Sequence, residues 1–133
     1  MKITMFTDGG SRGNPGPSAA GAVLKQGEET IAEVSRYMGE TTNNQAEYTS
    51  IIIGLEKAKE LGVSEVEVVM DSELAVKQMN REYKVKHPEI AKRFLEVNNL
   101  LHSFKKVTFR HVRREFNKEA DALVNKCIDE HLA

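Results

Sequence analysis

Apolar and polar residues alternate at the start of the chain. Ile3, Met5 and Thr7 fall on one side of this alternation, which has the period of a β-strand with one buried face. The run leads into an acid, Asp8, and residues 9–16 are rich in glycine. We therefore predict a strand that ends at Asp8, followed by a turn in which the backbone can approach a ligand closely. A solvated acid in a hairpin turn is the alternative for Asp8 taken alone.

The next two apolar runs complete an antiparallel unit. Residues 19–25 and 30–37 have strand character, and the polar segment 26–29 supplies a short turn between them. Three strands joined by short loops predict an antiparallel meander.

A long helix should follow over residues 45–61, because a polar segment suited to capping precedes it and Gly62 follows it. Glu47 lies on its apolar stripe near the helix start. The rest of that stripe consists of Ile51, Gly54, Ala58 and Leu61. Small residues on it would let the helix approach the sheet closely, with Glu47 pointing toward the sheet.

In the second half of the chain, apolar residues recur at the spacing of strands in some segments and of helices in others. Val66, Val68, Val69 and Met70 form a dense apolar run, which is typical of a central strand. The predicted elements are a strand at 63–70, helices at 72–80 and 88–103, a strand at 107–112 and a final helix that Asn117 caps. The order βββαβααβα predicts an α/β fold over residues 1–133 as a single domain, with a five-stranded mixed sheet of three antiparallel strands and then two parallel ones.

Composition narrows the class of protein. The formal net charge is −1, so any anionic partner must be met by a local patch and not by the molecule as a whole. Cys127 is the only cysteine, which excludes an internal disulfide and a cysteine-based zinc site. Its place on an apolar helical face predicts a packed thiol. With no apolar run of membrane-spanning length and no signal-peptide pattern, we expect a soluble cytoplasmic protein.

Four acids fall at the ends of predicted elements. Asp8 and Asp71 each follow an apolar strand, and they would emerge side by side if these strands are parallel neighbours. Glu47 and Asp121 lie near helix starts on stripes that face the core. Clustered carboxylates repel one another and favour protonation, a problem that divalent cations remove. Two hypotheses stay open on this pattern: a site for two Mg²⁺ ions, or alternatively Mn²⁺, that hydrolyses phosphodiesters, and four unrelated caps and ion pairs.

Four segments resemble the signature segments of type 1 ribonuclease H. They read TDGGSRGNPGPSAAGAVL, TTNNQAEYTSIIIGLEKA, VVMDSELAV and VRREFNKEADALV, in the family's order and spacing. The resemblance spans nearly the whole chain and implies a ribonuclease H-like fold. It also implies that the family's metal-coordinating acids correspond to Asp8, Glu47, Asp71 and Asp121. The family cleaves the RNA strand of RNA–DNA hybrids with Mg²⁺ and leaves 5′-phosphate and 3′-hydroxyl ends, so we expect this activity here.

The resemblance further implies how an RNA–DNA hybrid, the expected partner of a monomeric enzyme, is held. Backbone groups of Gly9, Gly10 and Ser11 and the side chain of Glu47 would meet ribose 2′-hydroxyl groups, which distinguish RNA from DNA. Thr42 would reach a phosphate of the DNA strand. The residues expected in the minor groove are Asn14, Asn43, Asn44 and Gln45. Amide side chains and free N–H groups at a helix start suit these roles, and simple N-capping is the alternative for Asn43 and Asn44.

One departure from the family concerns a mobile histidine that many members carry before the last acid, assigned to proton transfer or product release. Here the loop is shortened and Arg114 is the nearest match, as in some archaeal and plant-like members. Arginine can hold a phosphate but cannot act as a general base. We expect activity to survive at an altered rate. His111 lies within a strand pattern, for which we expect a structural or exposed role.

A second departure is the loop 81–87, where certain bacterial members insert a long basic protrusion and this chain has only a few residues. Local positive potential must then come from Lys84, Lys86, Arg110, Arg113 and Arg114. We expect modest hybrid affinity that falls steeply with salt. Plain solvated charges are the alternative for Lys84 and Lys86.

Other classes with a glycine turn after the first strand fit less well. GGSRGNPG lacks the G-x-G-x-x-G of dinucleotide-binding domains and precedes a strand, and the chain has no Walker loop. Junction resolvases, exonucleases and transposases could share the acidic cluster, but the TNN and GNPG segments argue against them. A catalytically impaired hybrid-binding module remains the alternative, because Arg114 replaces the family histidine.

Overall fold

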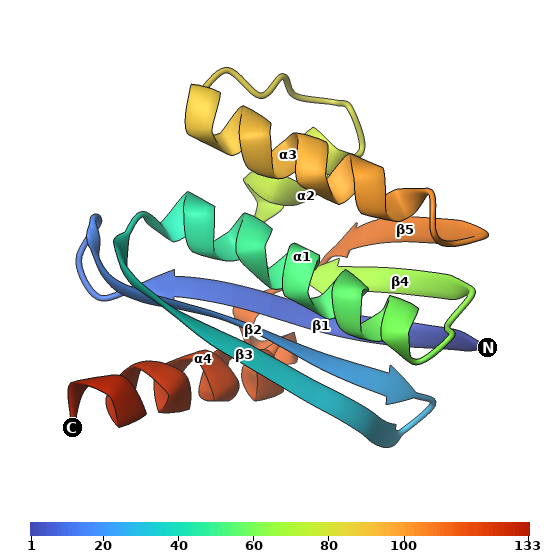
Figure 1. The fold of residues 1–133 in the computed structure, drawn as a ribbon, viewed down its shortest axis with the longest axis horizontal. Helices are drawn as coiled ribbons and strands as arrows, with labels where there is room; N and C mark the ends of the chain where they lie inside the picture. Colours follow the sequence, from blue (N-terminus) through green and yellow to red (C-terminus); the bar gives the residue numbers. More distant parts are fainter.

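The computed structural model describes residues 1–133 and confirms a five-stranded mixed sheet with helices on both faces (Figure 1). The strand order is β3-β2-β1-β4-β5. β1, β2 and β3 are antiparallel neighbours, whereas β1 and β4, and β4 and β5, are parallel. The elements are β1 Lys2–Ser11, β2 Gly16–Gln26, β3 Glu29–Thr41, α1 Asn43–Glu60, β4 Glu65–Met70, α2 Glu73–Met79, α3 Pro88–Leu101, β5 Lys106–His111, a 3₁₀ turn Arg114–Phe116 and α4 Lys118–Leu132.

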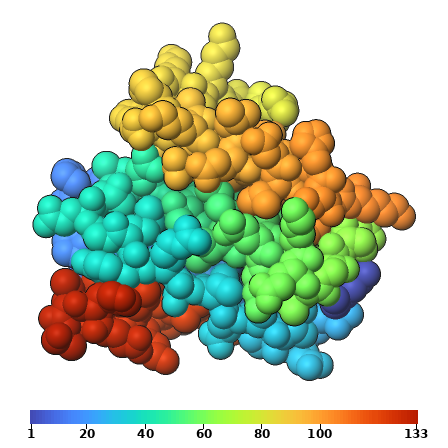
Figure 2. Space-filling view, in the orientation of Figure 1, coloured from blue at the N-terminus to red at the C-terminus, as the bar shows by residue number.

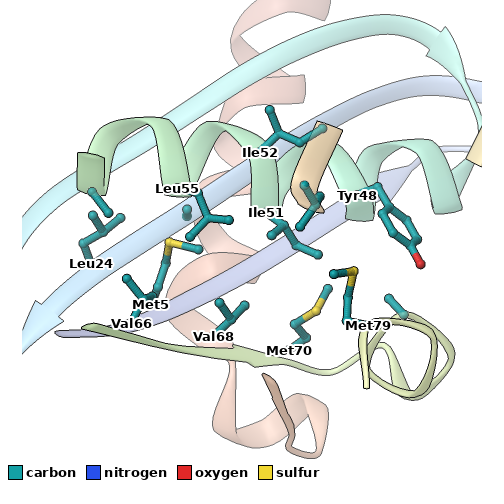
Figure 3. Packing of buried hydrophobic residues seen from close by; sticks show 14 of the residues in the cluster. Met5, Leu24, Tyr48, Ile51, Ile52, Leu55, Val66, Val68, Met70 and Met79 are labelled. Carbon is teal, nitrogen blue, oxygen red and sulfur yellow. The ribbon is translucent and has the colours of Figure 1, made fainter. Parts of the chain in front are cut away.

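The main hydrophobic core lies between α1 and the sheet (Figure 3). Gly54 makes this contact close, because a Cβ atom there would lie 2.6 Å from Met5 Sδ and 3.0 Å from Ala22 Cβ. The predicted close approach of the helix is therefore confirmed. Leu61 does not belong to the buried stripe: it is the residue after α1 and is 37% exposed.

The opposite face of the sheet is covered by α4 (Figure 1). Val124, Cys127 and Ile128 pack there against Ala19. Cys127 is buried, as predicted for a packed thiol. On the other side α3 packs against α1, and in the space-filling view the side chains of α1 and β3 separate α3 from α4 (Figure 2). None of the helices is both long and apolar enough to span a membrane.

Strand β1 does not end at Asp8, which corrects the prediction. Gly9 and Gly10 continue the strand by pairing with Ala20 and Ala19 of β2, whereas the pairing with β4 stops at Thr7. Asp8 therefore stands just past the end of the parallel ladder but inside the antiparallel one. Helix α1 also begins two residues earlier than predicted, with Thr42 as the N-cap.

Candidate active site

Asp8 and Asp71 lie side by side because of strand register. Thr7 of β1 is paired with Met70 of β4 in the parallel ladder, and the two acids are the next residues along each chain. The predicted juxtaposition of these carboxylates is confirmed. Asp8 is only 8% exposed, and Asp71 is half-buried.

Glu47 reaches the same place because Gly9 lets α1 lie directly on β1. A Cβ atom at residue 9 would lie 2.2 Å from the carbonyl carbon of Ala46 and 2.3 Å from the amide nitrogen of Glu47. Only a glycine leaves room for this backbone contact. Glu47, itself 9% exposed, is thereby held beside the strand end that carries Asp8.

The four acids share one open pocket of about 340 Å³. Asp121 enters it from the first turn of α4, opposite the helix that carries Glu47. The pocket brings together most of the residues predicted for the site: Asp8, Gly9, Gly10, Ser11, Asn43, Glu47, Asp71, Arg114 and Asp121.

The acids are short of nearby positive charge. Burial, with repulsion from Asp71, Asp121 and Glu47, raises the pKa of Asp8 to about 8. Burial also raises the pKa of Glu47 to about 7, against hydrogen bonds from Ser72 and Asn43 that lower it. The pKa of Asp71 is raised by burial too, although the charge of Arg114 and a hydrogen bond from the Asn117 side chain oppose the shift. Such mutual repulsion is what a bound cation would relieve.

The donor set fits a hard divalent cation. Every candidate ligand is a carboxylate oxygen, the type of ligand that Mg²⁺ and Mn²⁺ prefer. No group of three or more Asp, Glu, His or Cys side chains lies in an arrangement that could hold a metal ion by itself. Mg²⁺ does not require such a group, because it keeps several waters and is usually bound by one or two carboxylates together with substrate phosphate oxygens.

A hydrogen-bond network joins the β1–β2 loop to α1 through Asn43. Its Oδ1 accepts from the amide of Ser11 at 3.2 Å, its Nδ2 donates to Glu47 Oε1 at 3.0 Å, and its own amide donates to Asn14 Oδ1 at 3.1 Å. Asn43 therefore orients Glu47. The N-cap is instead Thr42, whose hydroxyl accepts from the amide of Gln45 at 3.3 Å.

The remaining predicted hybrid contacts lie beside the acidic pocket. Asn14, Thr42 and Asn44 line an adjoining hollow of about 390 Å³ together with Asn43, and His87 at the start of α3 forms its other wall. Gln45 lies in neither hollow. Arg114 is exposed on the 3₁₀ turn, and its guanidinium lies 4.0 Å from Asp121.

Four further polar residues touch this site and were not predicted for it: Arg12, Ser72, Asn117 and Asn125. Ser72 caps α2 by accepting from the amide of Ala75 at 3.2 Å, and its side chain lowers the pKa of Glu47. Asn125 donates to Asp121 Oδ2 at 3.4 Å and accepts from Arg12 at 3.3 Å. A sequence signal existed for Asn125, because it lies four residues after Asp121 and therefore on the same face of α4.

Comparison with known proteins finds a matching family model and similar proteins over most of this chain. The protein-family model described as "Reverse transcriptase-like" matches residues 6–127. The "Bifunctional protein Rv2228c" of Mycobacterium tuberculosis is 42% identical over 131 residues, which cover 97% of this chain and 36% of that protein. This chain thus spans about a third of the length of that relative.

Two solved structures resemble this chain over almost their whole length. RNase H1 from the archaeon Halobacterium salinarum is 37% identical, with a TM-score of 0.94 over 98% of this chain and 99% of that one. LC11-RNase H1, solved in complex with an RNA/DNA hybrid, is 44% identical, again with a TM-score of 0.94 and with 98% and 99% of the two chains covered.

Proposed function

Because this chain belongs to the type 1 ribonuclease H family, we propose that it is an endonuclease that hydrolyses the RNA strand of RNA–DNA hybrids, leaving 5′-phosphate and 3′-hydroxyl ends. The observation that carries the proposal is the convergence of Asp8, Glu47, Asp71 and Asp121 on one open pocket. The raised pKa values of Asp8, Glu47 and Asp71 mark a site built for more positive charge than the chain itself supplies.

Members of the family use divalent metal ions, and we propose that the four acids here hold two Mg²⁺ ions, with Mn²⁺ as an alternative. When bound, such a pair activates a water molecule and stabilises the leaving oxygen. The carboxyl groups of Asp8 and Glu47 would release their protons when they bind a metal, since metal ligands must be ionised. Arg114 cannot take a proton, so its proposed role is to hold a phosphate beside Asp121.

The proposed contacts with the hybrid follow from the two adjoining hollows. Gly9, Gly10 and Ser11 present backbone to the acidic pocket, where the 2′-hydroxyl of the RNA strand would also meet Glu47. Asn43 fixes both Ser11 and Glu47 by hydrogen bonds. The exposed residues around the second hollow would contact the minor groove and the DNA strand; these are Asn14, Thr42 and Asn44, with Gln45 beside them.

The experiment is cleavage of a hybrid whose RNA strand is labelled, with Mg²⁺, Mn²⁺ or EDTA, beside single-stranded RNA and duplex DNA. We expect cleavage of RNA in the hybrid alone, and none in EDTA. Asp71→Asn should abolish cleavage, whereas Glu60→Gln should retain it. Glu60 is a suitable control because it is an exposed acid paired only with Lys57.

A hybrid-binding module without catalysis is the alternative outcome of the same assay. Arg114 favours it, since an arginine beside Asp121 brings positive charge to the acids without an acid–base group. Binding of the hybrid with no cleavage in either metal would establish that alternative and reject the hydrolase.

A further inference from the structure

Asn117 stands at the N-cap position of α4 but does not cap the helix. Its side chain is 1% exposed and makes no capping hydrogen bond, which corrects the prediction that it caps α4. Its Nδ2 instead donates to the carbonyl oxygen of Thr7 on β1, at 2.9 Å and 110 positions away in the chain. The usual stabilising role of an asparagine at a helix start is therefore absent.

The contacts of Asn117 lead to three of the four acids. Thr7, whose carbonyl it binds, is followed directly by Asp8. The Asn117 side chain also lies close enough to the carboxylate of Asp71 to oppose the rise of its pKa, and the backbone carbonyl of Asn117 accepts from the amide of Asp121 at 3.1 Å. One residue thus joins the end of β1, the acid after β4 and the first turn of α4.

This arrangement has a cost in stability. Oδ1 of Asn117 is buried without a hydrogen-bond partner, and a buried polar atom without a partner lowers the free energy of unfolding. A serine at the same position could cap α4 and would bury less polar surface. The side chain of Asn117 therefore makes its contacts beside the acids and does not stabilise the start of α4.

We propose that Asn117 is a positioning residue whose side-chain amide sets the spacing of Asp8, Asp71 and Asp121 for divalent ions. The inference rests on the proposed function. A planar NH₂ group offers two hydrogens in fixed directions. One is donated to the Thr7 carbonyl, and the second is left for the Asp71 carboxylate beside it. A hydroxyl group has only one hydrogen to donate and a methyl group has none.

The test compares Asn117→Ser with Asn117→Ala. Serine restores an N-cap but not the bridge, and alanine supplies neither. For each folded variant, Mg²⁺ binding is measured by calorimetry without nucleic acid, thermal unfolding is followed in EDTA, and kcat and KM are measured on the hybrid. We expect both variants to bind Mg²⁺ about 10- to 100-fold more weakly, with reduced kcat and unchanged KM for the hybrid. Only the alanine variant should show a clearly lower Tm.

Gln78→Ala is the matched control. Gln78 is another buried amide residue, but it does not line the acidic pocket. It accepts from the Tyr48 hydroxyl and donates to the Lys84 carbonyl oxygen. Its loss should lower the Tm and leave Mg²⁺ affinity unchanged.

Wild-type Mg²⁺ affinity and kcat in Asn117→Ser would overturn the positioning role. If the wild-type protein binds Mg²⁺ but does not cut the hybrid, the proposed function fails. A weaker affinity in Asn117→Ser would still support the positioning role in that case.

Discussion

Asp8 holds its proton to about pH 8 because it is buried and faces three other acids. In the unfolded chain it would ionise near its ordinary pKa of 3.8. Between these two values the unfolded state binds fewer protons, so the free energy of unfolding of the metal-free protein falls as pH rises. Glu47 acts in the same direction between 4.5 and about 7. We predict that the Tm in EDTA decreases steadily across this range, measured by thermal unfolding at a series of pH values.

Asp8→Asn isolates the contribution of this carboxyl. The Tm of this variant in EDTA should depend much less on pH. At pH 8 its metal-free Tm should exceed that of the wild type by about 3 °C or more, which corresponds to roughly 1 kcal/mol in a chain of this size. Mg²⁺ should raise the Tm of the wild type more than that of the variant. A wild-type Tm that is constant with pH in EDTA would contradict this account.

Arg114 is the positive charge that most lowers the pKa of Asp71. Arg114→Ala should therefore raise that pKa, and the acidic limb of the pH–rate profile should move to higher pH, because the carboxylate must be ionised to hold metal. Arg113→Ala is the comparison, since the two side chains are 83% and 80% exposed and Arg113 pairs with Glu115. If the acidic limb of the pH–rate profile moves equally in both variants, the shift reflects the overall charge of the protein and not a specific interaction of Arg114 with Asp71.

At the scale of elements, the site depends on the contact between β1 and α1. Gly9→Ala would place a Cβ atom 2.2 Å from the carbonyl carbon of Ala46, so α1 must move away from the strand. We predict a loss of roughly 3 kcal/mol in the free energy of unfolding, at the upper end for an overpacked core, measured by urea denaturation. Gly10→Ala is the control, because its nearest neighbour would be Val124 Cγ1 at 3.4 Å. Equal stability of the two variants would contradict the close contact.

Elements also show where prediction from sequence succeeds and where it stops. Asp71 was correctly placed after its strand, because the apolar run of β4 is buried and ends where the ladder ends. The end of β1 is predicted too early, at Asp8, because it is determined by β2, which continues to pair beyond the acid. The side chain of Asn117 could not be placed from local pattern, since the partner that draws it away from the helix is Thr7, 110 residues distant.

At the scale of the whole molecule, most basic residues near the site are already paired with acids. The pairs are Arg12–Asp129 at 2.7 Å, Arg110–Glu67 at 3.3 Å and Arg113–Glu115 at 3.6 Å. Lys84 and Lys86, in the loop before α3, form no ion pair, and Arg114 is only loosely paired at 4.0 Å. Of the five basic residues predicted to supply local positive potential, three are therefore available to meet the phosphates of a hybrid: Lys84, Lys86 and Arg114.

Salt dependence of hybrid binding measures how many phosphates those cations neutralise. With roughly three contacts, the logarithm of the affinity should fall against the logarithm of the salt concentration with a slope of roughly −3. Binding is measured with Asp71→Asn, which prevents cleavage. Replacing Lys84 and Lys86 by glutamine should reduce the magnitude of the slope by about two. Lys92→Gln should not change it, because Lys92 pairs with Glu89 on α3. An unchanged slope in the double variant would mean that Lys84 and Lys86 are plain solvated charges, so that the phosphates must be met by the paired arginines after those pairs open.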